Sequence, residues 1–119
     1  MRIDIIFDTI CPWCFIGKRR LEEMLSRRPQ LNADIYWHAF LLNPDMPAEG
    51  TDFGNYMQNK FGGELRSQRL FAAIDQAGRS VGIEFDFAKV GRTPSTIDSH
   101  RLVRYAARDE RASEMVETL

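Results

Sequence analysis

The chain contains two cysteines, Cys11 and Cys14, and the two residues between them are Pro12 and Trp13. Proline favours the first position of a helix, so this pattern places Cys11 at the N-cap and Cys14 one turn later. Backbone N–H groups and the helix dipole stabilise a thiolate at that end, and only Cys11 is placed to gain from them. We therefore predict that Cys11 is a nucleophile and that Cys14 resolves the mixed disulfides that Cys11 forms.

A Cys-x-x-Cys pair is also half of a zinc site, so a metal centre is the main structural alternative. The chain has no second cysteine pair, and the remaining candidate ligands are His38 and His100. His38 falls in a predicted strand, where a packed imidazole is the more frequent case. We therefore expect no metal and no cofactor beyond the redox-active disulfide. Pro12 and Trp13 would support the pair by setting which N–H groups reach the sulfur.

The segments around the cysteines predict a β-α-β unit. Residues 2–8 are rich in β-branched and aromatic types with alternating apolar side chains, which indicates a strand. An amphipathic helix follows, and Pro29 ends it. The apolar run at 33–42 is too continuous for a strand with one wet face and predicts a central strand. A right-handed parallel crossover would put the cysteine loop at the carboxyl end of the first strand.

The chain after residue 42 is predicted to be largely helical. A loop rich in proline and glycine leads to helices at 52–61 and 64–79. The alternating Ile83, Phe85 and Phe87 indicate either a short strand or an extended connector.

A capping box is predicted where the last helix begins. Ser95 and Asp98 follow Pro94, in a spacing typical of such a box, and the apolar spacing continues to Ala106. We divide this α/β chain into a β-α-β half at 1–45 and the start of a helical insertion at 46–119.

Composition limits the classes of function. With 119 residues and 44% apolar side chains, the chain can bury one core and should be soluble. Its formal net charge is -1, so the chain lacks the excess of positive charge that is typical of proteins that bind nucleic acid or an anionic membrane. No segment has the roughly 20 apolar residues of a membrane helix, and the first residues lack the features of a secretory signal. We expect a cytoplasmic protein with neither nucleic-acid nor membrane partners.

Three motifs in order resemble a known family. They are Asp8-x-x-Cys11-Pro12-Trp13-Cys14-Phe15-Ile16-Gly17-Lys18, Phe40-x-Leu42-Asn43-Pro44-Asp45 and Pro94-x-x-x-Asp98-x-His100-Arg101-Leu102. Together they resemble the DsbA-like thioredoxin-fold proteins of the FrnE type, which are predicted dithiol-disulfide isomerases and relatives of 2-hydroxychromene-2-carboxylate isomerase. The resemblance implies a thioredoxin fold interrupted by a helical insertion, with Cys11 and Cys14 as its active site.

The chain departs from this family where it ends. Family members return from the insertion to two more strands and a closing helix, and a cis-proline loop there faces the cysteines. The resemblance therefore implies that this chain is the N-terminal portion of the fold, with the C-terminal part missing. A two-stranded sheet with an open edge invites strand exchange, so we expect a possible homodimer through that edge.

Two residues outside the pair have both a structural and a functional interpretation. His100 either approaches the cysteines and biases the Cys11 thiolate, or is a helix-capping or surface histidine. Asp8 either accepts a proton from Cys14, if it is buried, or is an exposed turn residue. For Asp8 the sequence favours the turn.

Two groups of side chains are candidates for substrate contacts. The basic run at 18–20 either attracts an anionic partner such as glutathione or is a solvated helix face. Five aromatic residues either line a peptide groove or fill the core: Trp37, Phe40, Phe71, Phe85 and Phe87. For both groups the sequence favours the structural interpretation.

Three functions remain open from the sequence. The first is a dithiol oxidoreductase or disulfide isomerase acting on thiol- or disulfide-containing proteins or small molecules, with glutathione as a possible co-substrate. The second is a glutathione-dependent isomerase of the chromene-carboxylate type, which a resolving Cys14 disfavours because it would expel glutathione from Cys11. The third is an inactive truncated fragment that serves as an interaction unit.

Overall fold

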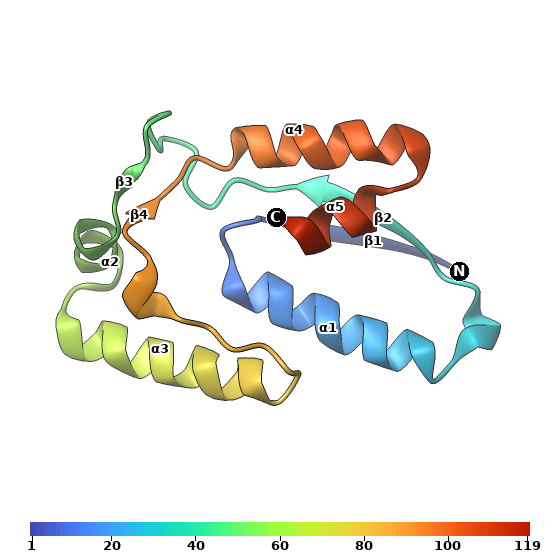
Figure 1. Ribbon diagram of the computed structural model, residues 1–119, viewed down its shortest axis with the longest axis horizontal. Coiled ribbons are helices and arrows are strands. Elements are labelled where there is room, and N and C mark those ends of the chain that lie inside the picture. The colour runs from blue at the N-terminus through green and yellow to red at the C-terminus, as the bar shows by residue number, and fades with distance from the viewer. The chain divides into compact units, whose positions relative to one another are not determined.

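The computed structural model describes all residues from 1 to 119, and they form two compact units (Figure 1). The first unit combines residues 1–44 with residues 96–119, and the second unit spans residues 45–95. None of the helices has the length and apolar character needed to span a membrane.

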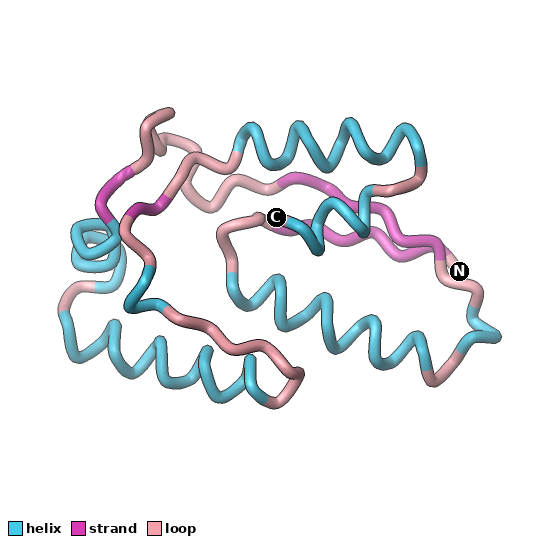
Figure 2. The backbone as a smooth tube through the Cα atoms, in the orientation of Figure 1, coloured by secondary structure: helices cyan, strands magenta, loops and turns pink.

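The first unit begins with the predicted β-α-β arrangement. Strand β1 (Arg2–Phe7) pairs in parallel with β2 (Asp34–Ala39), with Arg2 opposite Asp34 and Phe7 opposite Ala39. Helix α1 (Pro12–Ser26) connects them through a 3₁₀ turn (Pro29–Leu31), as the tube in Figure 2 shows. The helix ends before Pro29 because the residue before a proline is disfavoured in helical geometry.

Strand β2 is not the fully buried strand that its sequence predicted. Its burial alternates, and Tyr36 is 46% exposed while its neighbours Ile35 and Trp37 are partly buried. The sheet of this chain has two strands, so one edge of β2 has no strand partner. The alternation follows because one face of the strand is covered by helices and the other faces water.

The helices that cover β2 come from the end of the chain. Helix α4 (Ile97–Ala106) is followed by a 3₁₀ turn (Ala107–Asp109) and α5 (Ala112–Thr118), and both helices contact β2. Residues 96–119 therefore pack with the N-terminal unit, whereas the predicted division placed them in one insertion with residues 46–95. The contacts of α4 and α5 with β2 join segments about 60 to 80 residues apart, which local sequence patterns do not report.

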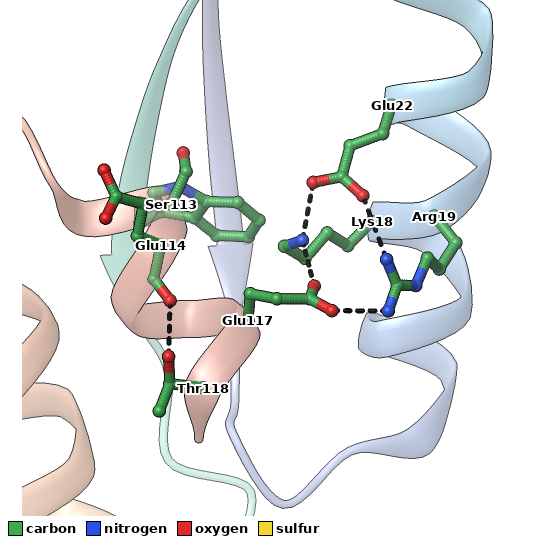
Figure 3. A network of polar contacts seen from close by, with 8 residues as sticks. Lys18, Arg19, Glu22, Ser113, Glu114, Glu117 and Thr118 are labelled. Carbon is green, nitrogen blue, oxygen red and sulfur yellow. Dashed lines mark hydrogen bonds and ion pairs between the residues drawn. The ribbon is translucent and has the colours of Figure 1, made fainter.

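Helix α5 is also tied to α1 through charged side chains (Figure 3). Lys18 of α1 is 4% exposed in its side chain and forms ion pairs with Glu22 on its own helix and Glu117 on α5. Arg19 also pairs with Glu117. On the strand side, the Trp37 indole N–H donates to the Ser113 hydroxyl at 2.9 Å.

The second unit contains β3 (Thr51–Asp52), α2 (Phe53–Phe61), α3 (Glu64–Arg79), a 3₁₀ turn (Phe87–Lys89) and β4 (Arg92–Thr93). The two short strands pair antiparallel. Its core holds Met57, Ile74 and Ile83 beside four stacked rings: Phe53, Phe71, Phe85 and Phe87. The stretch from Ile83 to Phe87 is a connector that delivers apolar side chains to this core rather than a strand.

Candidate redox site

The site begins where β1 ends and the chain turns into α1. The Cys11 N–H donates to the Asp8 carbonyl at 3.1 Å, which closes the turn, and Cys11 takes extended geometry as the N-cap residue. Pro12 is the first helical residue, and the Cys14 N–H donates back to the Cys11 carbonyl at 3.0 Å. The backbone thus places Cys11 at the helix start and Cys14 in its first turn, as the Cys-Pro spacing predicted.

The two cysteines carry free thiols, each partly buried, and they interact with each other. The Cys14 thiol donates a hydrogen bond to the Cys11 sulfur, and this bond is the main reason that the pKa of Cys11 falls to about 6 from an ordinary 9.0. Backbone N–H groups of Cys14 and Trp13 lower it further, while burial and the charge of Asp8 oppose them. Cys11 is therefore mostly thiolate at neutral pH.

The same contact acts in the opposite direction on Cys14. Donation to the Cys11 sulfur, followed by burial, raises the pKa of Cys14 far above its ordinary value. The charges of Cys11 and Asp8 add to this rise, whereas a backbone hydrogen bond from Asp8 opposes it. At neutral pH one thiol of the pair is ionised and the other keeps its proton.

Asp8 directly follows β1 and is buried, with 2% of its surface exposed. One carboxylate oxygen accepts the Leu42 N–H at 2.8 Å, and the other lies 3.2 Å from His100 Nε2. The sequence favoured an exposed turn residue, and this was wrong for the side chain. The backbone of Asp8 does form the turn, but the carboxylate points into the unit because Leu42 and α4 supply partners there.

His100 is neither a surface nor a capping residue. It is 8% exposed, and its ring meets Phe7 edge to face at a centroid distance of 5.1 Å. The helix begins after Thr96, whose side chain makes no capping bond, so the predicted box of Ser95 and Asp98 does not form. Instead, α4 directs His100 towards the end of β1 and its Asp8 carboxylate.

A second polar contact joins the turn after β1 to α4, and no sequence pattern predicted it. Thr9 Oγ1 lies 2.6 Å from Ser99 Oγ, and Ser99 Oγ donates to the Thr96 carbonyl at 2.7 Å. Because a serine hydroxyl has one proton, Thr9 is the donor to Ser99. Two contacts therefore join α4 to the turn after β1. Ser99 contacts Thr9, and His100 contacts Asp8. Single hydroxyl residues are too common for this pairing to be recognised in advance.

The other predicted candidates lie in varied surroundings. Trp13 lies between the two cysteines in the sequence, in the first turn of α1, and is 45% exposed. In the basic run at 18–20, expected to contact glutathione or to form a solvated face, Lys18 and Arg19 are paired with carboxylates, whereas Arg20 is exposed. His38 pairs with Asp4 at 2.7 Å in an exposed position, and no group of three potential metal ligands is present.

The aromatic candidates mostly fill cores, as the sequence favoured. Phe71, Phe85 and Phe87 stack on one another in the second unit. Trp37 meets Phe7 edge to face at 5.0 Å in the first unit. Phe40 is the exception, with 53% of its surface exposed just after β2.

Comparison with known proteins identifies the fold and the family of the chain. A probable DsbA oxidoreductase from Streptomyces coelicolor has a similar structure, with a TM-score of 0.85 and 24% sequence identity. The match covers 98% of this chain and 51% of the other, so the chain spans about half the length of that protein. No curated protein matches the sequence. The family model of the DSBA-like thioredoxin domain matches residues 2–119. The chain therefore belongs to the DSBA-like thioredoxin domain family and has its fold.

Proposed function

We propose that the protein is a thiol/disulfide oxidoreductase that uses Cys11 as nucleophile and Cys14 as resolving thiol. The observation that carries the proposal is the placement of two free thiols at the start of α1, in hydrogen-bonding contact with each other, and the direction of their pKa shifts supports it. The pKa of Cys11 is lowered to about 6, whereas that of Cys14 is raised. A pair with one thiolate ready to attack and one protonated thiol in hydrogen-bonding contact fits a two-step exchange.

In the first step the Cys11 thiolate attacks a substrate disulfide. A bond forms between Cys11 and one substrate sulfur, the substrate disulfide breaks, and the other sulfur leaves as a thiolate. In the second step Cys14 loses its proton and attacks Cys11, which forms the Cys11–Cys14 disulfide and releases the second substrate sulfur as a thiolate. The protein is oxidised and the substrate is reduced by two electrons. The reverse sequence oxidises a substrate dithiol.

The second step needs a base, because Cys14 is a protonated thiol in the reduced pair and its burial, which favours the protonated form, does not depend on the charge of Cys11. Asp8 is the candidate, since its charge acts on both thiols. It is buried and held on both oxygens. In the mixed disulfide the Cys11 sulfur carries no charge, so the Cys14 thiol is free to give its proton to Asp8 as it attacks.

The chemistry of the site limits the substrates to molecules that carry a thiol or a disulfide. We propose thiol- or disulfide-containing proteins or small molecules as partners, rather than nucleic acids or membranes. Glutathione would serve as a co-substrate, and no bound cofactor is needed because the disulfide carries the electrons. The assignment to the FrnE type and a cytoplasmic location are part of this proposal.

A glutathione-dependent isomerase and an inactive fragment are the alternatives, and the wild-type protein and one variant together separate all three. Cys14→Ser should abolish disulfide turnover and leave substrate covalently attached to Cys11, which intact-protein mass spectrometry would detect. An isomerase should keep its activity towards a chromene carboxylate in this variant. If the wild-type protein forms no mixed disulfide with oxidised glutathione and no internal disulfide, the proposed function is refuted.

A further inference from the structure

Two adjacent residues of α4 contact two adjacent residues of the turn that precedes the cysteines. Ser99 accepts a hydrogen bond from Thr9, and His100 lies against the Asp8 carboxylate. The contacts join parts of the chain that are 90 and 92 residues apart. Since the Asp8 carbonyl accepts the Cys11 N–H, anything that moves Asp8 also moves the start of α1.

The contact between His100 and Asp8 is shielded from water. The side chains are 7% and 1% exposed, and the Phe7 ring covers one side of the imidazole. Such a contact is worth more than an exposed one, because water does not compete for either partner. The chain contains an exposed counterpart, His38 with Asp4, whose side chains are 47% and 44% exposed.

The Asp8 carboxylate has two oxygens, and each has one hydrogen-bond partner. Leu42 holds one oxygen from the segment after β2, and His100 holds the other from α4. With Leu42 alone, the carboxylate could rotate about that single bond, and its second oxygen would be buried without a partner. His100 therefore decides where the second oxygen lies.

We propose that His100 and Ser99 are positioning residues for the redox pair, which hold Asp8 and Thr9 so that the Asp8 carboxylate can take the proton of Cys14 in the resolving step. This inference rests on the proposed function and extends it to α4. His100 would donate its Nε2–H to Asp8 and would not touch the substrate. Among ionisable groups, His100 contacts the Asp8 carboxylate directly and the two thiols feel its charge, and the segment after β2 contributes a backbone N–H.

The test separates the two steps of exchange with oxidised glutathione. Reduced protein is mixed with excess oxidised glutathione, and the formation and decay of the mixed disulfide are followed by acid quenching and mass spectrometry from pH 5.5 to 8.5. The first step depends on the glutathione concentration, and the second step does not. His100→Leu removes the donor, and we expect its second step to slow by about tenfold or more at pH 7. That rate should then increase with pH, as expected for proton loss to water, while the first step changes by no more than about twofold.

Matched variants make the result specific. His100→Gln keeps an N–H near the position of Nε2 and should restore most of the second-step rate. Ser99→Ala should show the same signature more weakly, and it serves as the test if His100→Leu does not fold. His38→Leu removes the exposed histidine partner and should leave both steps unchanged.

The outcomes distinguish the inference from the function on which it rests. If the wild-type protein forms no mixed disulfide, the proposed function itself fails. If the wild type completes both steps and His100→Leu completes the second at the same rate and with the same pH profile, the positioning role is refuted and the function stands. Equal loss in His100→Leu and His100→Gln would also refute it, because the hydrogen bond would then not be the cause.

Discussion

The redox potential of the Cys11/Cys14 pair should depend on pH in a way that reveals the lowered pKa of Cys11. A thiol with the ordinary pKa of 9.0 is about 1% ionised at pH 7. With its pKa lowered to about 6, Cys11 is about 90% ionised at that pH. The pKa of Cys14 is raised instead, so this thiol keeps its proton over the whole range. Reduction of the disulfide therefore takes up a different number of protons on the two sides of pH 6.

The expected slopes follow from that count. Below pH 6 two protons accompany two electrons, and the potential should fall by about 59 mV per pH unit. Between pH 6 and pH 9 one proton accompanies two electrons, and the slope should halve to about 30 mV per pH unit. The sign follows from linkage: a depressed thiol pKa stabilises the reduced folded form above the ordinary thiol pKa. This stabilisation is lost as the pH falls through about 6.

The assay is equilibration with a dithiol couple of known pH dependence from pH 5 to pH 8, read by thiol trapping and by the fluorescence of Trp13. A single slope of about 59 mV per unit through pH 8 would refute the lowered pKa. The matched variant is Cys14→Ala, because the Cys14 hydrogen bond is the largest cause of the Cys11 shift. Its Cys11 pKa should rise, and alkylation by iodoacetamide at pH 5 should slow by about three- to fourfold for each pKa unit.

Further predictions concern stability and assembly. Glu117→Ala should destabilise the protein by about 1 to 3 kcal/mol in urea unfolding, because it removes one of two carboxylates from a Lys18 side chain that is 4% exposed. Glu23→Ala, in an ion pair open to water, should leave the unfolding midpoint unchanged, and equal effects would contradict the difference in burial. Gly50→Ala should cost more than Gly62→Ala. Both have positive φ, but a Cβ at residue 50 would lie 2.6 Å from a backbone oxygen, whereas Gly62 faces open space. We expect about 1 kcal/mol for Gly62, and a similar loss at both sites would be evidence against the close approach. If the open sheet edge pairs two copies, light scattering should give twice the mass of one chain, and a monomer would end that prediction.

The local features of the site could be predicted from the sequence, because neighbouring residues determine them. A cysteine before a proline predicted the N-cap and the start of α1, and both are confirmed. The helix predicted at 64–79 is α3, with the same bounds. These features depend on helix capping and on apolar spacing, which act over one or two turns.

The features that depend on distant contacts could not be predicted in this way. Asp8 is polar, follows a strand and precedes a helix, which is typical of an exposed turn, and its burial depends on Leu42 and on a helix that begins near residue 97. The capping box at Ser95 failed for a related reason. Thr96 became the cap residue, and Ser99 bonds to its carbonyl while it accepts from Thr9.

The Asp8 charge has opposite consequences for the two steps of the proposed exchange. It raises the pKa of both thiols and so opposes the Cys11 thiolate that the first step needs. The Cys14 thiol and the N–H groups at the helix start outweigh it at Cys11, because the net pKa is still about 6. In the second step the same carboxylate is the proposed proton acceptor. Asp8→Asn should therefore lower the Cys11 pKa further, seen as faster alkylation at pH 5, and at the same time slow the decay of the mixed disulfide at pH 7. A general structural defect would slow both reactions, so opposite changes in the two rates would identify the carboxylate charge as the cause, and parallel changes would refute its role.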